Sequence, residues 1–119
     1  MLYESGENYL ETILLLYKKN GQVRSVDIAT ELNFSKPSVS RAVGILKKAK
    51  LITVDASGLI TLTQSGLEQA MQINERHNTL TRYLVAVLGV SEETASADAC
   101  RIEHVISAET FTRIKEALL

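Results

Sequence analysis

Two short runs with β-strand character stand in a chain whose remaining pattern is helical, and this arrangement limits the folds open to it. The runs lie at 51–54 (LITV) and 59–62 (LITL), and the residues between them, 55–58 (DASG), have the composition of a turn. Together they predict a β-hairpin. Helical patterns precede and follow it, so we predict a mostly α protein in which this hairpin is the only β-structure.

Three helices are predicted ahead of the hairpin. Apolar residues recur at helical spacing over about 5–19, and Asn20-Gly21 supplies a stop. Ser25 is expected to cap a short helix over 26–32. Ser35 is expected to cap the third helix, with Pro37 in its first turn. The buried side of this third helix is predicted to be formed by Val39, Val43, Ile45 and Leu46.

The residues after the hairpin predict three more helices. Thr63 or Ser65 caps a long helix that ends at Gly89, Ser91 starts another that runs to about Val105, and Ser107 caps a last one through Ala117. The apolar side of the long helix is assigned to Leu67, Ala70, Met71, Ile73, Leu80, Leu84, Val87 and Leu88. The only shift in composition falls near residue 63, which predicts two domains, 1–63 and 64–119.

Composition places the chain among ordinary globular proteins. Of its 119 residues 45% are hydrophobic and 23% are charged, which excludes a disordered or collagenous chain. Apolar runs such as Ile13–Leu16 are too short to span a bilayer, and Met1–Glu4 does not begin a signal peptide. The single cysteine, Cys100, cannot form an internal disulfide. We therefore expect a cytoplasmic protein with no membrane partner.

Charge is distributed unevenly along the chain. Residues 1–63 hold eight basic and six acidic residues, whereas 64–119 hold five basic and eight acidic residues. The segment 36–50 contains five basic residues and no acidic residue. Such a stripe is typical of a surface that attracts a phosphate backbone, and the alternative is a solvated helix face.

The order helix, helix, turn, helix, hairpin is that of a winged helix-turn-helix, whose second paired helix enters the major groove of DNA. Small hydroxyls near the start of this helix permit close approach, and Arg41 can read a guanine edge. Lys47, Lys48 and Lys50 would lie on flanking phosphates. The predicted DNA contacts are Ser25, Ser35, Lys36, Pro37, Ser38, Ser40, Arg41 and Lys47. The alternative is a winged helix used for protein contacts.

A second set of residues has the chemistry of a metal site. Cys100, Glu103 and His104 have the i, i+3, i+4 spacing of one helix face, and Asn8 and Glu11 are three apart on the first helix. His77 is the only other histidine. Thiolate, imidazole and carboxylate groups together suit a first-row divalent metal. No Cys-x-x-Cys pair is present, which excludes a zinc finger.

Three runs resemble one known family: 7–13 (ENYLETI), 35–40 (SKPSVS) and, most specifically, 98–107 (DACRIEHVIS). The chain resembles the diphtheria toxin repressor and manganese transport repressor family of metal-dependent transcriptional regulators. This resemblance implies a winged helix-turn-helix followed by a helical dimerisation domain. It also implies a homodimer that binds a palindromic operator when Fe(II) or Mn(II) is present.

The resemblance also implies a ligand set placed between the two domains. The residues that match are Glu11, His77, Cys100, Glu103 and His104, and Asn8 stands where the family often carries Asp or Met. Thr81 and Ser96 occupy positions that hold a carboxylate and a histidine at a second site in iron-responsive members, so that site is expected to be absent or altered. The metal would fix the angle between the domains and thereby the separation of the two recognition helices, about 34 Å or a multiple.

Other functions remain as alternatives. One is a winged-helix regulator in which Cys100 senses oxidation without a metal, and another is a protein-interaction module without a DNA role. An enzyme is not expected, because the sequence holds neither a nucleophile motif nor a phosphate loop.

Overall fold

The computed structural model describes residues 4–119. These residues divide into two compact units, the first ending at Met71 and the second spanning Gln72–Leu119. Met1, Leu2 and Tyr3, on which part of the signal-peptide expectation rests, lie outside the described residues. In the part of the chain that the structure describes, no helix is both long enough and apolar enough to cross a membrane.

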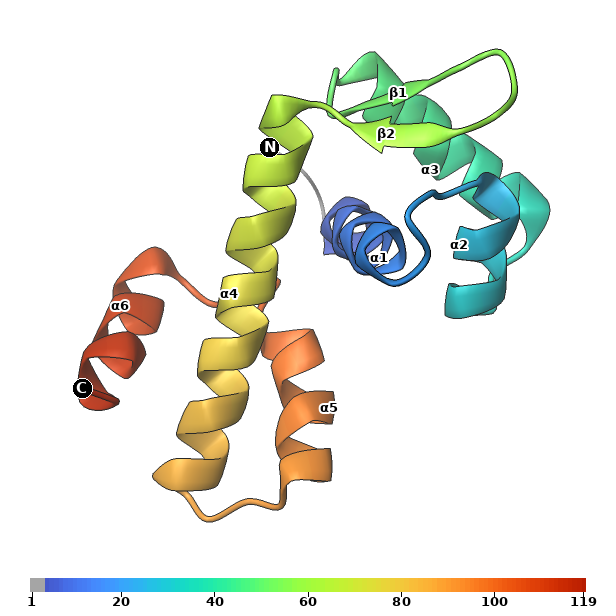
Figure 1. Ribbon diagram of the computed structural model, residues 1–119. Helices are drawn as coiled ribbons and strands as arrows, with labels where there is room; N and C mark the ends of the chain where they lie inside the picture. Colours follow the sequence, from blue (N-terminus) through green and yellow to red (C-terminus); the bar gives the residue numbers. More distant parts are fainter. Residues whose placement is uncertain (1–3) are drawn as a thin grey trace. The chain divides into compact units, whose positions relative to one another are not determined.

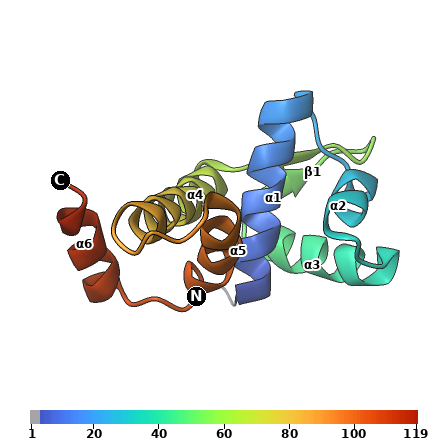
Figure 2. The same ribbon diagram turned by 90° about the horizontal axis from the view of Figure 1, so that it is seen from below.

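The first unit is a three-helix group with a hairpin. Its helices are α1 (Glu4–Asn20), α2 (Ser25–Leu32) and α3 (Lys36–Lys48), and its strands are β1 (Ile52–Val54) and β2 (Ile60–Leu62). Helix α1, seen end on in Figure 1 and lengthwise in Figure 2, packs against α2 and α3, and α3 packs against β1. The predicted winged helix-turn-helix is confirmed. The core side chains, all nearly inaccessible to solvent, include Leu10, Ile13, Ile28, Val39, Leu46, Ile52 and Ile60.

The hairpin, called the wing below (52–62), is antiparallel with Thr53 opposite Thr61. A third segment joins it, because the carbonyl of Val23 accepts a hydrogen bond from the Ile60 amide at 2.8 Å. At its other side the wing leads into helix α4 (Gln64–Ala86), where Gly66 lies against the backbone of Leu51. A Cβ at Gly66 would be 1.9 Å from the Leu51 carbonyl oxygen, so this crossing requires glycine.

Helix caps decide where several elements begin. The Ser35 hydroxyl accepts from the Ser38 amide at 3.3 Å, as predicted, and the Thr63 hydroxyl accepts from the Gly66 amide at 3.1 Å. The prediction for Ser25 is wrong: Ser25 is the first residue of α2, and Asp27 closes the helix start by accepting from the Arg24 amide at 2.9 Å. A carboxylate at this position can reach back to the cap amide, which a serine within the helix cannot.

Helix α3 ends in a motif that bears on function. The Leu51 amide donates to the Leu46 carbonyl and the Lys50 amide donates to the Lys47 carbonyl, each at 3.0 Å, which is the Schellman pattern. Lys50 therefore takes a left-handed backbone conformation, with φ of 62°. Glycine is the usual residue at this point, because it carries no Cβ.

The second unit contains the later part of α4, α5 (Glu92–Ile102) and α6 (Ala108–Ala117). Helices α5 and α6 lie on different sides of α4 (Figures 1 and 2). Ser91 and Ser107 cap α5 and α6 by accepting from Thr94 and Thr110 amides, as predicted.

Some predicted boundaries and core positions are wrong. Helix α4 ends at Ala86 instead of Gly89, and α5 ends at Ile102 instead of Val105. Ile45 is exposed because Val39, Val43 and Leu46 already fill the inward face of α3. Met71 is also exposed, and Val87 and Leu88 lie in the turn beyond α4 and point to solvent.

Candidate metal centre and DNA-binding surface

The predicted metal ligands on the second unit gather around one buried carboxylate. Glu103 has no exposed surface, and its Oε2 lies 2.8 Å from His77 Nδ1 while its Oε1 lies 3.3 Å from His104 Nε2. His77 is on α4, 26 residues from Glu103 in sequence. The glutamate is thus held between two imidazoles that come from different parts of the unit.

Cys100 completes this cluster. One ligand atom each of His77, Cys100 and Glu103 lie within 4.8 Å of one another, a spacing that allows them to share one ion. Cys100 is exposed on α5 one turn before Glu103, which caps the C-terminal end of that helix. His104 follows the helix, so the expectation that Cys100, Glu103 and His104 share one continuous helix face is wrong at its last residue.

Positive charge stabilises a carboxylate in the position of Glu103. A carboxylate removed from water costs free energy unless it is paired, and the C-terminal end of a helix adds partial negative charge. Neutral imidazoles donate only one hydrogen bond each and supply no net charge. A divalent cation among nitrogen, sulfur and oxygen ligands fits this environment, and the donor types are those that first-row transition metals accept.

The second-site positions lie beside the same histidine. The Thr81 hydroxyl donates to the His77 carbonyl at 2.8 Å, and Ser96 Oγ lies 3.4 Å from His77 Nε2. Both residues therefore present hydroxyls here, where a neutral hydroxyl oxygen is a weak ligand compared with a carboxylate or an imidazole. The sequence did not indicate that Ser96 would contact His77.

Asn8 and Glu11 lie on α1, in the first unit, separated by three residues. Glu11 is buried and Asn8 is half-buried. Each unit therefore holds part of the predicted ligand set: two residues on α1, and four on α4, α5 and the turn after α5.

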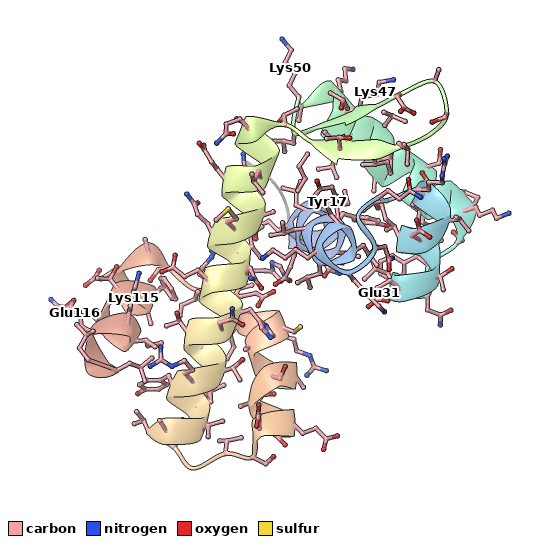
Figure 3. The ribbon with its side chains drawn as sticks, viewed as in Figure 1. Tyr17, Glu31, Lys47, Lys50, Lys115 and Glu116 are labelled. Atoms are coloured by element: carbon pink, nitrogen blue, oxygen red, sulfur yellow. The ribbon has the colours of Figure 1, made fainter. Side chains whose placement is uncertain are left out.

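The predicted DNA contacts gather on α3 of the first unit. All are exposed: Ser25, Ser35, Lys36, Pro37, Ser38, Ser40, Arg41 and Lys47. Ser25 is on α2, and the others lie on or directly before α3. Figure 3 shows Lys47 and Lys50 extending outward beside the wing. No acidic residue interrupts α3, so this surface has the charge that a phosphate backbone attracts.

Family models match both parts of the chain. Residues 1–58 match the iron-dependent repressor N-terminal DNA-binding domain, and 63–119 match the iron-dependent repressor metal-binding and dimerisation domain. The chain therefore belongs to the iron-dependent repressor family. The matched proteins include an iron-dependent repressor, a transcriptional regulator and a manganese-dependent transcriptional repressor, which support metal-dependent transcriptional repression.

Individual relatives agree with this assignment. An uncharacterised helix-turn-helix transcriptional regulator of Methanocaldococcus jannaschii is 35% identical over 94% of this chain and 90% of its own length. The iron-dependent repressor IdeR of Mycobacterium tuberculosis is 32% identical over 98% of this chain and 51% of its own length. The transcriptional regulator MntR of Escherichia coli is 36% identical over 88% of this chain and 67% of its own length.

Solved structures share the fold. IdeR of T. acidophilum superposes with a TM-score of 0.83 at 28% identity, and a manganese-dependent repressor in complex with manganese superposes with 0.86 at 26% identity. These matches cover 94% and 95% of this chain and 53% and 52% of those chains. The chain thus spans about half the length of these structures and of IdeR. None of the comparisons supports direct oxidation sensing by Cys100.

Proposed function

We propose that this chain is a cytoplasmic repressor that binds a palindromic DNA operator as a homodimer when Fe(II) or Mn(II) is bound. The observation that carries the proposal is Glu103, a fully buried carboxylate between two imidazoles with a thiol beside them. The same chain presents an exposed basic helix in a winged helix-turn-helix. A regulator that couples metal to DNA needs both features.

We propose that His77, Cys100, Glu103 and His104 hold the metal ion, and that Glu11 and Asn8 complete the set from α1. Donor chemistry and spacing support the first four, whereas Glu11 and Asn8 are supported by the sequence resemblance. The bound cation would supply the positive charge that offsets the carboxylates and the thiolate. The neutral amide of Asn8 adds an oxygen ligand without adding charge.

The proposed ligands belong to two units of one chain. A bound metal would therefore favour those conformations of the chain in which α1 and α5 both supply ligands to the ion. A dimer in which both chains are so restricted would present its two recognition helices at a defined separation. A metal shifts such an equilibrium only by its differential affinity for the two states. The DNA affinity of the dimer would therefore rise with metal by a limited factor.

On the DNA surface, we assign the predicted contacts to three tasks. Arg41 can donate two hydrogen bonds to a guanine edge and would carry specificity. Lys36, Lys47 and the hydroxyls of Ser25, Ser35, Ser38 and Ser40 would contact the backbone or adjacent base edges, and Pro37 would contribute an apolar contact. Exposure of all eight side chains supports these assignments.

Metal binding is tested by titrating the full chain with Mn(II) under anaerobic conditions by calorimetry. Glu103→Gln is expected to weaken Mn(II) binding by at least about tenfold, because the buried charge at the centre of the set is removed. Glu93→Gln, an exposed glutamate in the first turn of α5, is the matched control and should bind as wild type. Equal affinity of Glu103→Gln and wild type would contradict the ligand assignment.

DNA binding is tested by selecting from a randomised duplex library with Mn(II) and, in parallel, with a chelator. We expect a palindromic sequence to be enriched only with Mn(II), with half-sites about one helical turn or a multiple apart. Enrichment of nothing under either condition would contradict a DNA-binding role.

Thiol titration separates this proposal from direct redox sensing. If Cys100 is a ligand, Mn(II) or Fe(II) should slow its reaction with an alkylating reagent. If metal leaves the reaction rate unchanged, Cys100 does not belong to the ligand set.

A further inference from the structure

The turn of the wing carries an acidic residue on the unit proposed to approach DNA. Asp55 is exposed and directly follows β1. A carboxylate near phosphates lowers affinity by repulsion unless it performs another task. The contacts of Asp55 indicate such a task.

The side chain of Asp55 accepts several hydrogen bonds from residues of the same turn. Its Oδ1 accepts hydrogen bonds from the Ser57 amide at 2.9 Å, from the Ser57 hydroxyl at 2.8 Å and from the Leu59 amide at 2.9 Å. These bonds and the nearby charge of Arg24 lower the pKa of Asp55. The backbone closes the same turn, because the Gly58 amide donates to the Asp55 carbonyl at 3.0 Å.

Arg24 ties this turn to the helix-turn-helix. Its guanidinium donates to the Ser57 carbonyl, and its amide is held by Asp27 at the start of α2. The preceding residue, Val23, bonds to Ile60 nearer the base of the wing. The segment before α2 therefore contacts the wing at two points, at Ser57 through Arg24 and at Ile60 through Val23. Helix α2 in turn packs against the recognition helix α3.

These ties matter because the wing is small. Each strand has three residues, and a two-stranded hairpin of this size is marginal in water without further packing. If the tip of the wing becomes ordered only when DNA binds, the loss of entropy lowers the affinity. A tip that is already ordered does not carry this cost.

We propose that Arg24 and Asp55 are positioning residues that hold the tip of the wing at a fixed place relative to α3, so that the tip meets the DNA backbone already ordered. The proposal rests on the proposed function in DNA binding. Neither residue needs to touch DNA for this role. The hydrogen bonds that Asp55 makes in the turn outweigh the repulsion between its negative charge and the phosphates.

The sign of one substitution separates positioning from electrostatics. Asp55→Ala removes a negative charge, so repulsion alone predicts tighter DNA binding. Positioning predicts weaker binding, by about tenfold if the groups that make one or two backbone contacts become disordered. Asp55→Asn removes the same charge but keeps an acceptor oxygen, and should restore affinity to the wild-type value or above it. Glu31→Ala, an exposed glutamate of α2 (Figure 3), is the charge-matched control and should not weaken binding.

Arg24→Ala should weaken binding as well. The double variant Asp55→Ala with Arg24→Ala should bind DNA no more weakly than the weaker of the two single variants, because both residues act through the same tip.

In the free protein, amide hydrogen exchange at Ser57 and Leu59 should accelerate in each single variant while the far-ultraviolet circular dichroism is unchanged. Affinity is measured by fluorescence anisotropy with Mn(II) and a duplex of the selected sequence.

Two failures are distinguishable. A wild type that binds DNA together with a folded Asp55→Ala variant that binds equally or more tightly contradicts this proposal alone. A wild type that binds no duplex contradicts the proposed function and this proposal together.

Discussion

Replacing Lys50 by glycine should stabilise the protein and weaken its binding to DNA. Lys50 has φ of 62°, and its carbonyl accepts from the Thr63 hydroxyl at 2.8 Å, so the left-handed conformation is built into the link between α3 and the wing. A residue with a Cβ costs about 1–2 kcal/mol in that conformation. Glycine loses about 0.5–1 kcal/mol more backbone entropy on folding, which leaves a net gain of about 0.5–1 kcal/mol.

The gain corresponds to a rise in Tm of about 2–4 °C for a chain of this size, and scanning calorimetry measures it. Lys50→Ala is one control, because it removes the charge and keeps the Cβ, so its Tm should not rise. Lys48→Gly is the other, because Lys48 is the last residue of α3 and glycine within a helix destabilises. A Tm that falls in Lys50→Gly as it does in Lys48→Gly would refute the argument from backbone strain.

The DNA side of the same prediction is read from the salt dependence of affinity. If Lys50 contacts a phosphate, Lys50→Gly and Lys50→Ala should each reduce the slope of log K against log salt by about 0.9. An unchanged slope in both variants would show that this lysine is a solvated surface charge, and its presence in place of glycine would then have no explanation in DNA binding.

Two further predictions concern stability. Gly66→Ala should lower the free energy of unfolding by about 2–3 kcal/mol in urea titration, because its Cβ would lie 1.9 Å from the Leu51 carbonyl oxygen; a variant as stable as wild type would disprove the close crossing. The contribution of Asp55 to the free energy of unfolding should depend on pH. Hydrogen bonds from the turn and the charge of Arg24 lower its pKa from 3.8. Its stabilisation is therefore present above about pH 3.8 and is lost as the pH falls through the lower pKa of the folded state. Comparing wild type with Asp55→Asn by urea titration over this range checks the sign, and a difference that grows as the pH falls would contradict it.

Local signals in the sequence predicted the order of elements well. The caps at Ser35 and Ser107 depend on a hydroxyl and an amide three residues apart, so the sequence contains all the information needed. The hairpin likewise follows from two apolar runs around a turn. Buried positions were harder to predict, because Ile45 and Met71 fit an apolar helix face in sequence but are exposed in the packed unit.

Contacts between distant residues could be predicted only in part. The grouping of Cys100, Glu103 and His104 follows from short spacing, but the 2.8 Å contact of His77 with Glu103 joins residues 26 apart and depends on how α4 packs with α5. The bond from Arg24 to Ser57 joins residues 33 apart, and no pattern in the sequence marks either partner. The domain boundary near residue 63 and the assignment of individual DNA contacts stay predictions.

We propose that a metal ion at the Glu103 cluster controls DNA affinity. The most direct measurement is the affinity of the full chain for a duplex of the selected sequence by fluorescence anisotropy, with Mn(II) and with a chelator, for wild type, Glu103→Gln and the control Glu93→Gln. We expect Mn(II) to tighten binding by about 5- to 150-fold in wild type and in Glu93→Gln, and to have little effect in Glu103→Gln. Equal affinity of the wild type with Mn(II) and with the chelator would contradict it.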